Sequence, residues 1–170
     1  PYREWIGAQI RADGWGYACA GNPELAAEFA WRDAHWTHRA NGIYGEMMFA
    51  AIIASAFVVH DARELIAIGL SEIPRNCRLS EAVTAALDEI TRCHDFHSYM
   101  DWVQLHYGDL SPVHTVNNAL VVIGSMIYGQ MDFHKSICTS VEGAWDTDCI
   151  GASCGSFVGG GRGARGLIST

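Results

Sequence analysis

Apolar residues recur at intervals of three and four along most of the chain, which is the spacing of an α-helix. No stretch alternates convincingly between apolar and polar residues, so we expect essentially no β-sheet. The pattern predicts one all-α domain with helices over residues 22–36, 43–59, 61–70, 79–93, 98–107, 115–128 and 132–142, and a last helix that begins near 148 and fades into the glycines at 159–161.

Residues with strong terminal preferences mark several of these helices. Asn22 followed by Pro23 is a typical N-terminus, and Asp61 and Asp132 can each cap the helix that follows. The segment 43–59 is apolar around most of its circumference, which predicts a central, buried helix. The Gly-rich tail after residue 158 also has a composition that allows disorder.

Composition narrows the class of protein. A chain of 170 residues with 49% hydrophobic and 18% charged residues fits one well-packed domain. The formal charge of -8 argues against a nucleic-acid partner and suits carboxylates that collect divalent cations. The most apolar stretch, 47–59, is too short to span a bilayer, so we expect no membrane partner.

The cysteines and the first residues bear on the setting of the protein. The six cysteines form no CxxC pair, and their scatter is typical of buried thiols in a reducing cytoplasm. No segment has the pattern of a signal peptide. The sequence opens at Pro1, without Met and already in a helix-like pattern, so we expect a fragment or a processed chain.

The strongest chemical signal is the run Asp146-Thr147-Asp148. Two aspartates at i and i+2 beside a helix start place hard oxygen donors close together, which suits Mg²⁺, Mn²⁺ or Ca²⁺ rather than Zn²⁺. The small residues that follow let a ligand or a helix approach the backbone closely. The same aspartates could instead only cap the helix, because Asp is a favoured N-cap residue.

Other polar segments are less specific. The turn at 36–45 feeds the central helix, and its amides with His38 and Arg39 could hold phosphate, although an ordinary helix–helix turn fits as well. The loop expected at 13–17 could lie against a flat ligand or be a simple tight turn. The Asn pair within 112–118 either bonds a neighbouring loop or faces a pocket. His94 and His97 lack the further ligands that zinc needs and are expected at the surface.

Four of these segments together resemble the ADP-ribosylglycohydrolase family. They occur in the family's order and read GNPELAAEFAWRDA at 21–34, THRANGIYG at 37–45, HTVNNA at 114–119 and WDTDCIGASCGS at 145–156. The resemblance covers nearly the whole chain. It implies a compact orthogonal helical fold and an enzyme that hydrolyses the bond between ADP-ribose and a modified protein side chain or small molecule. It also implies a centre of two Mg²⁺ ions, with Mn²⁺ as a possible substitute.

The resemblance also assigns residues to that centre. It makes Asp146 and Asp148 metal ligands. It places Cys149 where relatives often have a Thr whose hydroxyl oxygen binds metal, and a thiol is a poor ligand for Mg²⁺.

It assigns further residues to the substrate. His38 would lie near the bound ADP-ribose. Gly14, Trp15, Gly16 and Tyr17 would lie by the diphosphate and the ribose. Asn117 would lie near the adenine end.

Two features of the family do not occur in these 170 residues. They are an early Gly-rich segment with a catalytic acid and a Thr-Asp-Asp motif that supplies the other metal ligands. We therefore expect residues 1–170 to be the C-terminal portion of a single domain, with the general base in an N-terminal segment or a complementing chain. The alternative is an inactive ADP-ribose-binding or crystallin-like structural protein on the same fold.

Overall fold

The computed structural model describes the backbone of residues 2–168 and the side chains of residues 2–161. In these residues the regular elements are helices, which confirms the all-α prediction; they are the short 3₁₀ turns η1 (Tyr2–Glu4) and η2 (Gln9–Arg11), then α1 (Asp13–Ala18), α2 (Pro23–Ala34), α3 (Asn41–Ala56), α4 (Ala62–Ser71), α5 (Arg78–Ile90), α6 (Phe96–Tyr107), α7 (Thr115–Tyr128), α8 (Phe133–Glu142) and α9 (Thr147–Ile168).

Strand-like pairing in the described chain is limited to one isolated antiparallel bridge between Trp5 and His114. That bridge ties the N-terminal segment to the start of α7, and Ile6 N–H adds a hydrogen bond to the Val113 carbonyl at 2.8 Å. No helix among the described residues has the length and apolar run needed to cross a bilayer.

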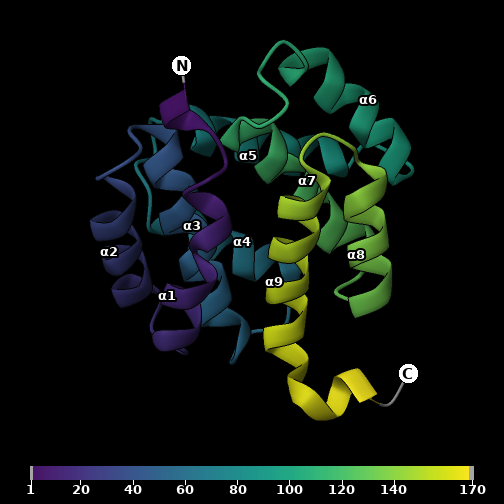
Figure 1. Ribbon diagram of the computed structural model, residues 1–170. Helices are drawn as coiled ribbons and strands as arrows, with labels where there is room; N and C mark the ends of the chain where they lie inside the picture. The colour runs from purple at the N-terminus through teal and green to yellow at the C-terminus, as the bar shows by residue number, and fades with distance from the viewer. Residues whose placement is uncertain (1, 169–170) are drawn as a thin grey trace.

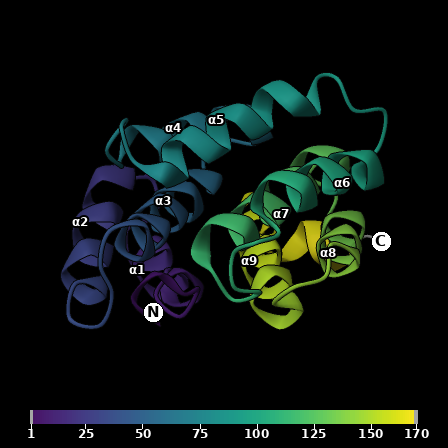
Figure 2. The ribbon, with the colours of Figure 1, turned by 90° about the horizontal axis from the view of Figure 1, so that it is seen from above.

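Helices α3 and α7 form the centre of the molecule, as the apolar pattern predicts. Both are buried over nearly their whole length. Helix α3 packs against α1, α2, α4 and α9, and helix α7 packs against α5, α6, α8 and α9. Figures 1 and 2 show α1–α3 on one side of the molecule and α7–α9 on the other, with α4 and α5 running across them.

Local capping chemistry sets most helix boundaries where the sequence predicts them. The Asn22 side chain accepts a hydrogen bond from Leu25 N–H at 3.2 Å, and Asp61 accepts one from Glu64 N–H at 2.9 Å. Asp132 caps α8 in the same way through Lys135 N–H at 3.0 Å. These bonds satisfy backbone donors that a helix leaves unpaired in its first turn.

Two expectations about local structure are wrong. The loop expected at 13–17 is helix α1, in which Gly16 packs so tightly on α3 that an added Cβ would lie 2.5 Å from Ile53. The last helix does not fade at 159–161 but continues to Ile168. An added Cβ at Gly159 or Gly160 would make only ordinary contacts with Phe133 or Ala56, whereas one at Gly161 would lie 3.2 Å from the Ala56 carbonyl oxygen, so α9 approaches α3 most closely at Gly161.

Candidate functional site

The run 145–148 forms the turn between α8 and α9. Ala144 and Trp145 both have positive φ values, 61° and 59°, which non-glycine residues rarely adopt. Asp146 follows them, and its carbonyl accepts the first helical hydrogen bond, from Ile150 N–H at 3.0 Å. Asp146 is therefore the N-cap residue of α9, and Asp148 and Cys149 lie in the first turn of that helix.

The three side chains form a compact set of donors. One ligand atom each from Asp146, Asp148 and Cys149 lies within 4.8 Å of the other two. Asp148 is exposed, whereas Asp146 and Cys149 are half-buried. Two carboxylates at this separation suit a hard divalent cation with an oxygen shell.

The electrostatics of the cluster are those of negative groups held close together. Burial raises the pKa of Asp146, and the neighbouring Asp148 adds to that rise, while hydrogen bonds from Cys149 oppose it. Burial, and then the two carboxylates, raise the pKa of Cys149 to about 12. Carboxylate oxygens suit Mg²⁺ better than a thiol does, so the two carboxylates are the cluster's main candidate metal ligands.

Asn118 holds the backbone of this turn in place. Its carboxamide oxygen accepts a hydrogen bond from Asp146 N–H at 3.2 Å. Its Nδ2 donates to the carbonyls of Pro112 and His114, both at 2.8 Å. Asn118 is fully buried, so these bonds fix the first turn of α7 to the start of α9.

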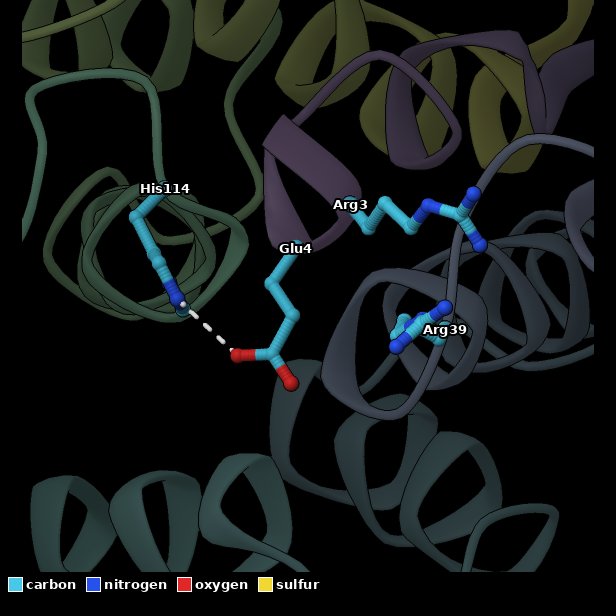
Figure 3. Close-up of a pocket in the computed structure, with 4 residues that line it drawn as sticks. All are labelled: Arg3, Glu4, Arg39 and His114. Carbon is cyan, nitrogen blue, oxygen red and sulfur yellow. Dashed lines mark hydrogen bonds and ion pairs between the residues drawn. The ribbon is translucent and has the colours of Figure 1, made fainter. Parts of the chain in front are cut away.

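An open pocket of about 430 Å³ is lined by Arg3, Glu4, Arg39 and His114. Figure 3 shows the two arginine side chains on one side of the pocket, and Glu4 turned toward His114 on the other. Asn118 is one helical turn after His114, and its bond to Asp146 connects this pocket to the acidic cluster. We call it the arginine pocket.

Glu4 and His114 form a fixed pair on one wall of the arginine pocket. His114 Nδ1 accepts a hydrogen bond from Val116 N–H at 3.1 Å, so in the neutral ring Nε2 carries the proton and donates to Glu4 Oε2 at 3.2 Å. Burial lowers the pKa of His114, although Glu4 opposes that change, and the ring is neutral at pH 7. The other Glu4 oxygen accepts from the Asn41 N–H at 3.4 Å and from its Nδ2 at 3.3 Å.

The arginines of the pocket have a different environment. Both guanidinium groups are exposed, and no described residue forms a hydrogen bond or an ion pair with either. Their backbones are joined, since Arg39 N–H donates to the Arg3 carbonyl at 3.0 Å. This wall therefore presents two unpaired positive charges to an anionic ligand.

The sequence model of the family described as ADP-ribosylglycohydrolase matches residues 4–169, essentially the whole chain. The chain belongs to this family. Neither a curated protein nor a solved structure matches it significantly. Membership of the ADP-ribosylglycohydrolase family indicates a glycosyl hydrolase that acts on ADP-ribosylated substrates, in a family that is typically metal-dependent.

The structure places the predicted substrate residues in different surroundings. His38 packs near Gly7, its Nδ1 lies 2.8 Å from Thr37 Oγ1, and burial together with the charge of Arg11 lowers its pKa. Asn117 is fully buried, donates to the Ser111 carbonyl at 3.0 Å and accepts from Asn118 N–H at 3.0 Å. Both therefore have partners within the protein.

The four residues 14–17 have different surroundings. Gly14 is exposed and has open space around it, whereas Gly16 is buried against α3. Tyr17 lies edge-on to Phe57 with a centroid distance of 6.2 Å. Trp15 turns instead toward Asp33, with its Nε1 3.5 Å from Oδ2.

In the turn before α3, the structure shows which group binds the first backbone N–H of the helix. The carboxylate of Glu4 accepts a hydrogen bond from the backbone N–H of Asn41 at the start of α3. This N–H is therefore not available to bind a phosphate. Sequence reasoning missed the roles of Glu4 and Arg3, whereas the bond between Asn118 and Asp146 N–H is the loop contact that it allowed for the Asn pair. Of the two side chains that the sequence offered as phosphate ligands in this turn, Arg39 lines the arginine pocket and His38 does not. His94 and His97 are exposed, as predicted.

Proposed function

We propose that the protein is a Mg²⁺-dependent hydrolase that cleaves the glycosidic bond between ADP-ribose and a modified protein side chain or small molecule. The observation that carries this proposal is the cluster of Asp146, Asp148 and Cys149 at the start of α9. In a chain of the ADP-ribosylglycohydrolase family, two converging carboxylates at this position support a metal centre rather than a helix cap alone.

In this proposal Asp146 and Asp148 hold the metal, and Mn²⁺ can replace Mg²⁺. A bound divalent cation would polarise the ribose hydroxyls and lower the pKa of water. Asn118 keeps the Asp146 backbone in position through its bond to the N–H. Cys149 is the weakest candidate ligand of the three, because a thiol is a poor ligand for Mg²⁺.

Two octahedral ions need more oxygen donors than two aspartates provide. We therefore propose that a further segment of the same domain, or a complementing chain, supplies the remaining ligands and the general base. On this view residues 1–170 form the C-terminal part of the catalytic domain. The exposure of Asp148 is compatible with such a contribution from outside this chain.

The arginine pocket is the proposed site for the diphosphate of the substrate. Arg3 and Arg39 offer planar groups of N–H donors to phosphate oxygens, and the Glu4–His114 pair fixes the opposite wall. His38, near the same turn, stays a proposed substrate contact. Gly14, Trp15, Gly16, Tyr17 and Asn117 also stay proposals, although the packing of Gly16 and the internal bonds of Asn117 are equally explained by the fold.

The test is the release of free ADP-ribose from an ADP-ribosylated protein and from a small ADP-ribosylated compound, with Mg²⁺ and with EDTA, using the protein encoded by the complete reading frame. Asp148→Asn should lower kcat at least about 100-fold, because it removes one metal carboxylate. Asp132→Asn removes a capping carboxylate at the start of α8 and is the matched control.

Arg39→Gln should mainly raise KM, since its guanidinium is placed to bind ground-state substrate.

Retained activity in Asp148→Asn, or in EDTA, would show that the metal assignment is wrong. An unchanged KM in Arg39→Gln would remove the diphosphate from the arginine pocket.

A second candidate function is an inactive ADP-ribose-binding or crystallin-like structural protein. The thiol of Cys149, at a position where a hydroxyl oxygen would bind metal better, favours this alternative. Calorimetry with ADP-ribose and Mg²⁺ separates the cases. Binding without turnover would support a binding protein, and no binding would leave a structural role.

The setting proposed from the sequence is the cytoplasm. All six cysteines are free thiols, which supports a reducing compartment.

A further inference from the structure

Arg11 lies in η2 and makes three directed contacts from one guanidinium group. Its Nε donates a hydrogen bond to Asp33 Oδ2 at 2.5 Å. Its Nη1 donates to the Gly7 carbonyl and its Nη2 to Thr37 Oγ1, both at 3.0 Å. Arginine suits this role because its N–H donors point in fixed directions from a planar group. The guanidinium therefore joins three parts of the chain: the end of α2, the segment before η2 and the turn before α3.

Two of these parts carry the arginines of the arginine pocket. Arg3 lies shortly before Gly7, and Arg39 lies shortly after Thr37. Their backbones meet, since Arg39 N–H donates to the Arg3 carbonyl at 3.0 Å, and Figure 3 shows both side chains on the same side of the pocket. The fit is close, because a Cβ added to Gly42 would lie 2.5 Å from the Arg3 carbonyl oxygen. A contact that fixes these two segments relative to each other therefore also fixes the backbones of both arginines.

The contact with Thr37 continues to His38. Arginine donates hydrogen bonds but accepts none, so the Thr37 hydroxyl oxygen accepts from Arg11 and its own proton is free for another group. Two acceptors lie within reach of this hydroxyl, His38 Nδ1 at 2.8 Å and the Ala34 carbonyl at 3.5 Å, and the shorter contact takes the proton. His38 Nδ1 is therefore an acceptor, and the proton of the neutral ring is on Nε2.

The Nε2 side of His38 faces the segment before η2. A Cβ added to Gly7 would lie 3.7 Å from this nitrogen, and the ring forms a hydrogen bond with the backbone of Trp5. Burial, and then the charge of Arg11, lower the pKa of His38, so the ring is neutral at pH 7. His38 thus joins the same two segments a second time, in an orientation that the hydroxyl contact sets.

Two carboxyl groups adjoin the Arg11 guanidinium, and they differ in charge. Burial would raise the pKa of Asp33, but the hydrogen bonds from Arg11 and Glu46 outweigh it and lower that pKa. Burial raises the pKa of Glu46 to about 9, and its Oε2 lies 3.8 Å from Arg11 Nη2, beyond hydrogen-bond distance. A neutral Glu46 therefore leaves Nη2 to the Thr37 hydroxyl.

We propose that Arg11 is a positioning residue of the arginine pocket: by joining the segment before η2 to the Thr37 hydroxyl, it holds the backbones of Arg3 and Arg39 in place before an anion binds. Donors that are held in place bind more tightly, because less conformational entropy is lost on binding. This inference rests on the anion-binding function proposed for the pocket, and it adds a residue that does not line that pocket.

The test is a calorimetric titration of the whole protein with inorganic pyrophosphate in EDTA at pH 7. Arg11→Lys keeps the positive charge but loses the planar group of donors, and Thr37→Val removes the accepting hydroxyl with little change in shape. Each should weaken pyrophosphate binding about tenfold, the loss expected when one charge-assisted hydrogen bond is misplaced. Thr37 is exposed, so Thr37→Val tests the contact without disturbing the core.

Each variant has a matched control. Thr37→Ser keeps the hydroxyl and should restore the wild-type affinity. Arg32→Lys makes the same exchange at an exposed arginine that pairs with Glu28 and does not line the arginine pocket, so it should leave the affinity unchanged. A loss in Arg11→Lys but not in Arg32→Lys therefore reports the contacts of Arg11 rather than the exchange of one cation for another.

The tautomer of His38, followed by nitrogen NMR of the imidazole ring, is a second readout. The wild type and Thr37→Ser should carry the ring proton on Nε2. Thr37→Val should populate both tautomers, because Nδ1 loses the hydroxyl that donates to it. A general loss of stability would not produce this pattern in a variant that unfolds at the wild-type temperature.

Different results separate this inference from the function on which it rests. Pyrophosphate binding that is lost in Arg39→Gln but unchanged in Thr37→Val and Arg11→Lys would overturn the positioning role alone. A wild-type tautomer of His38 in Thr37→Val would contradict it as well. A wild-type protein that binds no pyrophosphate would show that the anion site is wrong, and the positioning role with it. None of these variants touches the acidic cluster, so the metal centre is tested separately.

Discussion

Asp132 and Asp146 follow the same kind of turn at the starts of two consecutive helices. Each is preceded by two non-glycine residues with positive φ, Gln130 and Met131 in one case and Ala144 and Trp145 in the other. Position alone therefore makes both aspartates helix caps. Only Asp146 has a second carboxylate, Asp148, within its first helical turn, and that neighbour raises its pKa. The second carboxylate at Asp148, rather than the position in the turn, is the reason to propose a metal site at Asp146 and only a helix cap at Asp132.

Glu46 is another residue whose role depends on its neighbours. It is fully buried, and its carboxyl lies 3.8 Å from Arg11 Nη2 and next to the carboxyl of Asp33. Burial, and then the neighbouring Asp33, raise the pKa of Glu46 to about 9. The folded protein therefore keeps this proton at neutral pH, whereas the unfolded chain loses it above about pH 4.5.

This difference predicts how stability depends on pH. Because the folded state binds the extra proton between about pH 4.5 and pH 9, the free energy of unfolding should fall as pH rises through that window. Glu46→Gln imitates the protonated form and should remove this slope, with a gain on the order of 1 kcal/mol or more at pH 8. Urea unfolding at pH 6, 7 and 8 measures it. The half-exposed Glu28 provides the control Glu28→Gln, and a slope that is the same in all three proteins would contradict the assignment.

The helices show what local sequence can and cannot predict. Capping residues and 3.6-residue periodicity predicted α2 to α8 within a few residues, because these signals act within one or two turns. Helix α1 was missed because two glycines in six residues oppose helix formation locally, and packing on α3 outweighs that preference. Helix α9 likewise continues past its glycines where α3 and α8 support it.

The two glycines of α1 give a paired prediction. In Gly16→Ala the new Cβ would lie 2.5 Å from Ile53 and force α1 away from α3, which should destabilise the protein by about 1–3 kcal/mol. In Gly14→Ala the Cβ meets no atom within 4 Å, so better helix propensity should stabilise it by about 0.5–1 kcal/mol. Thermal or urea unfolding of both variants is the measurement. Equal effects of the same sign would show that contact with α3 does not determine α1.

At the scale of the whole molecule, the sequence indicated one part of the proposed site and not the other. Asp146 and Asp148 are neighbours in the chain, so spacing and family resemblance both indicate them. The arginine pocket joins Glu4 to His114, which are 110 positions apart, and no local pattern links residues at that separation. The hollow lined by Trp15, Phe29 and Asp33 is similar, since Trp15 belongs to α1 while Phe29 and Asp33 belong to α2. Such sites depend on how the helices pack, so they can be recognised only once the three-dimensional structure is known.

The central claim is that Asp146 and Asp148 form a divalent-metal site, and a titration with Mn²⁺ followed by electron paramagnetic resonance tests it most directly. The account predicts that the wild-type protein binds Mn²⁺ in competition with Mg²⁺, that Asp148→Asn weakens this binding at least about tenfold, and that Asp132→Asn leaves it unchanged. Equal Mn²⁺ affinities in the wild type and Asp148→Asn would contradict the account and leave Asp146 as a helix cap.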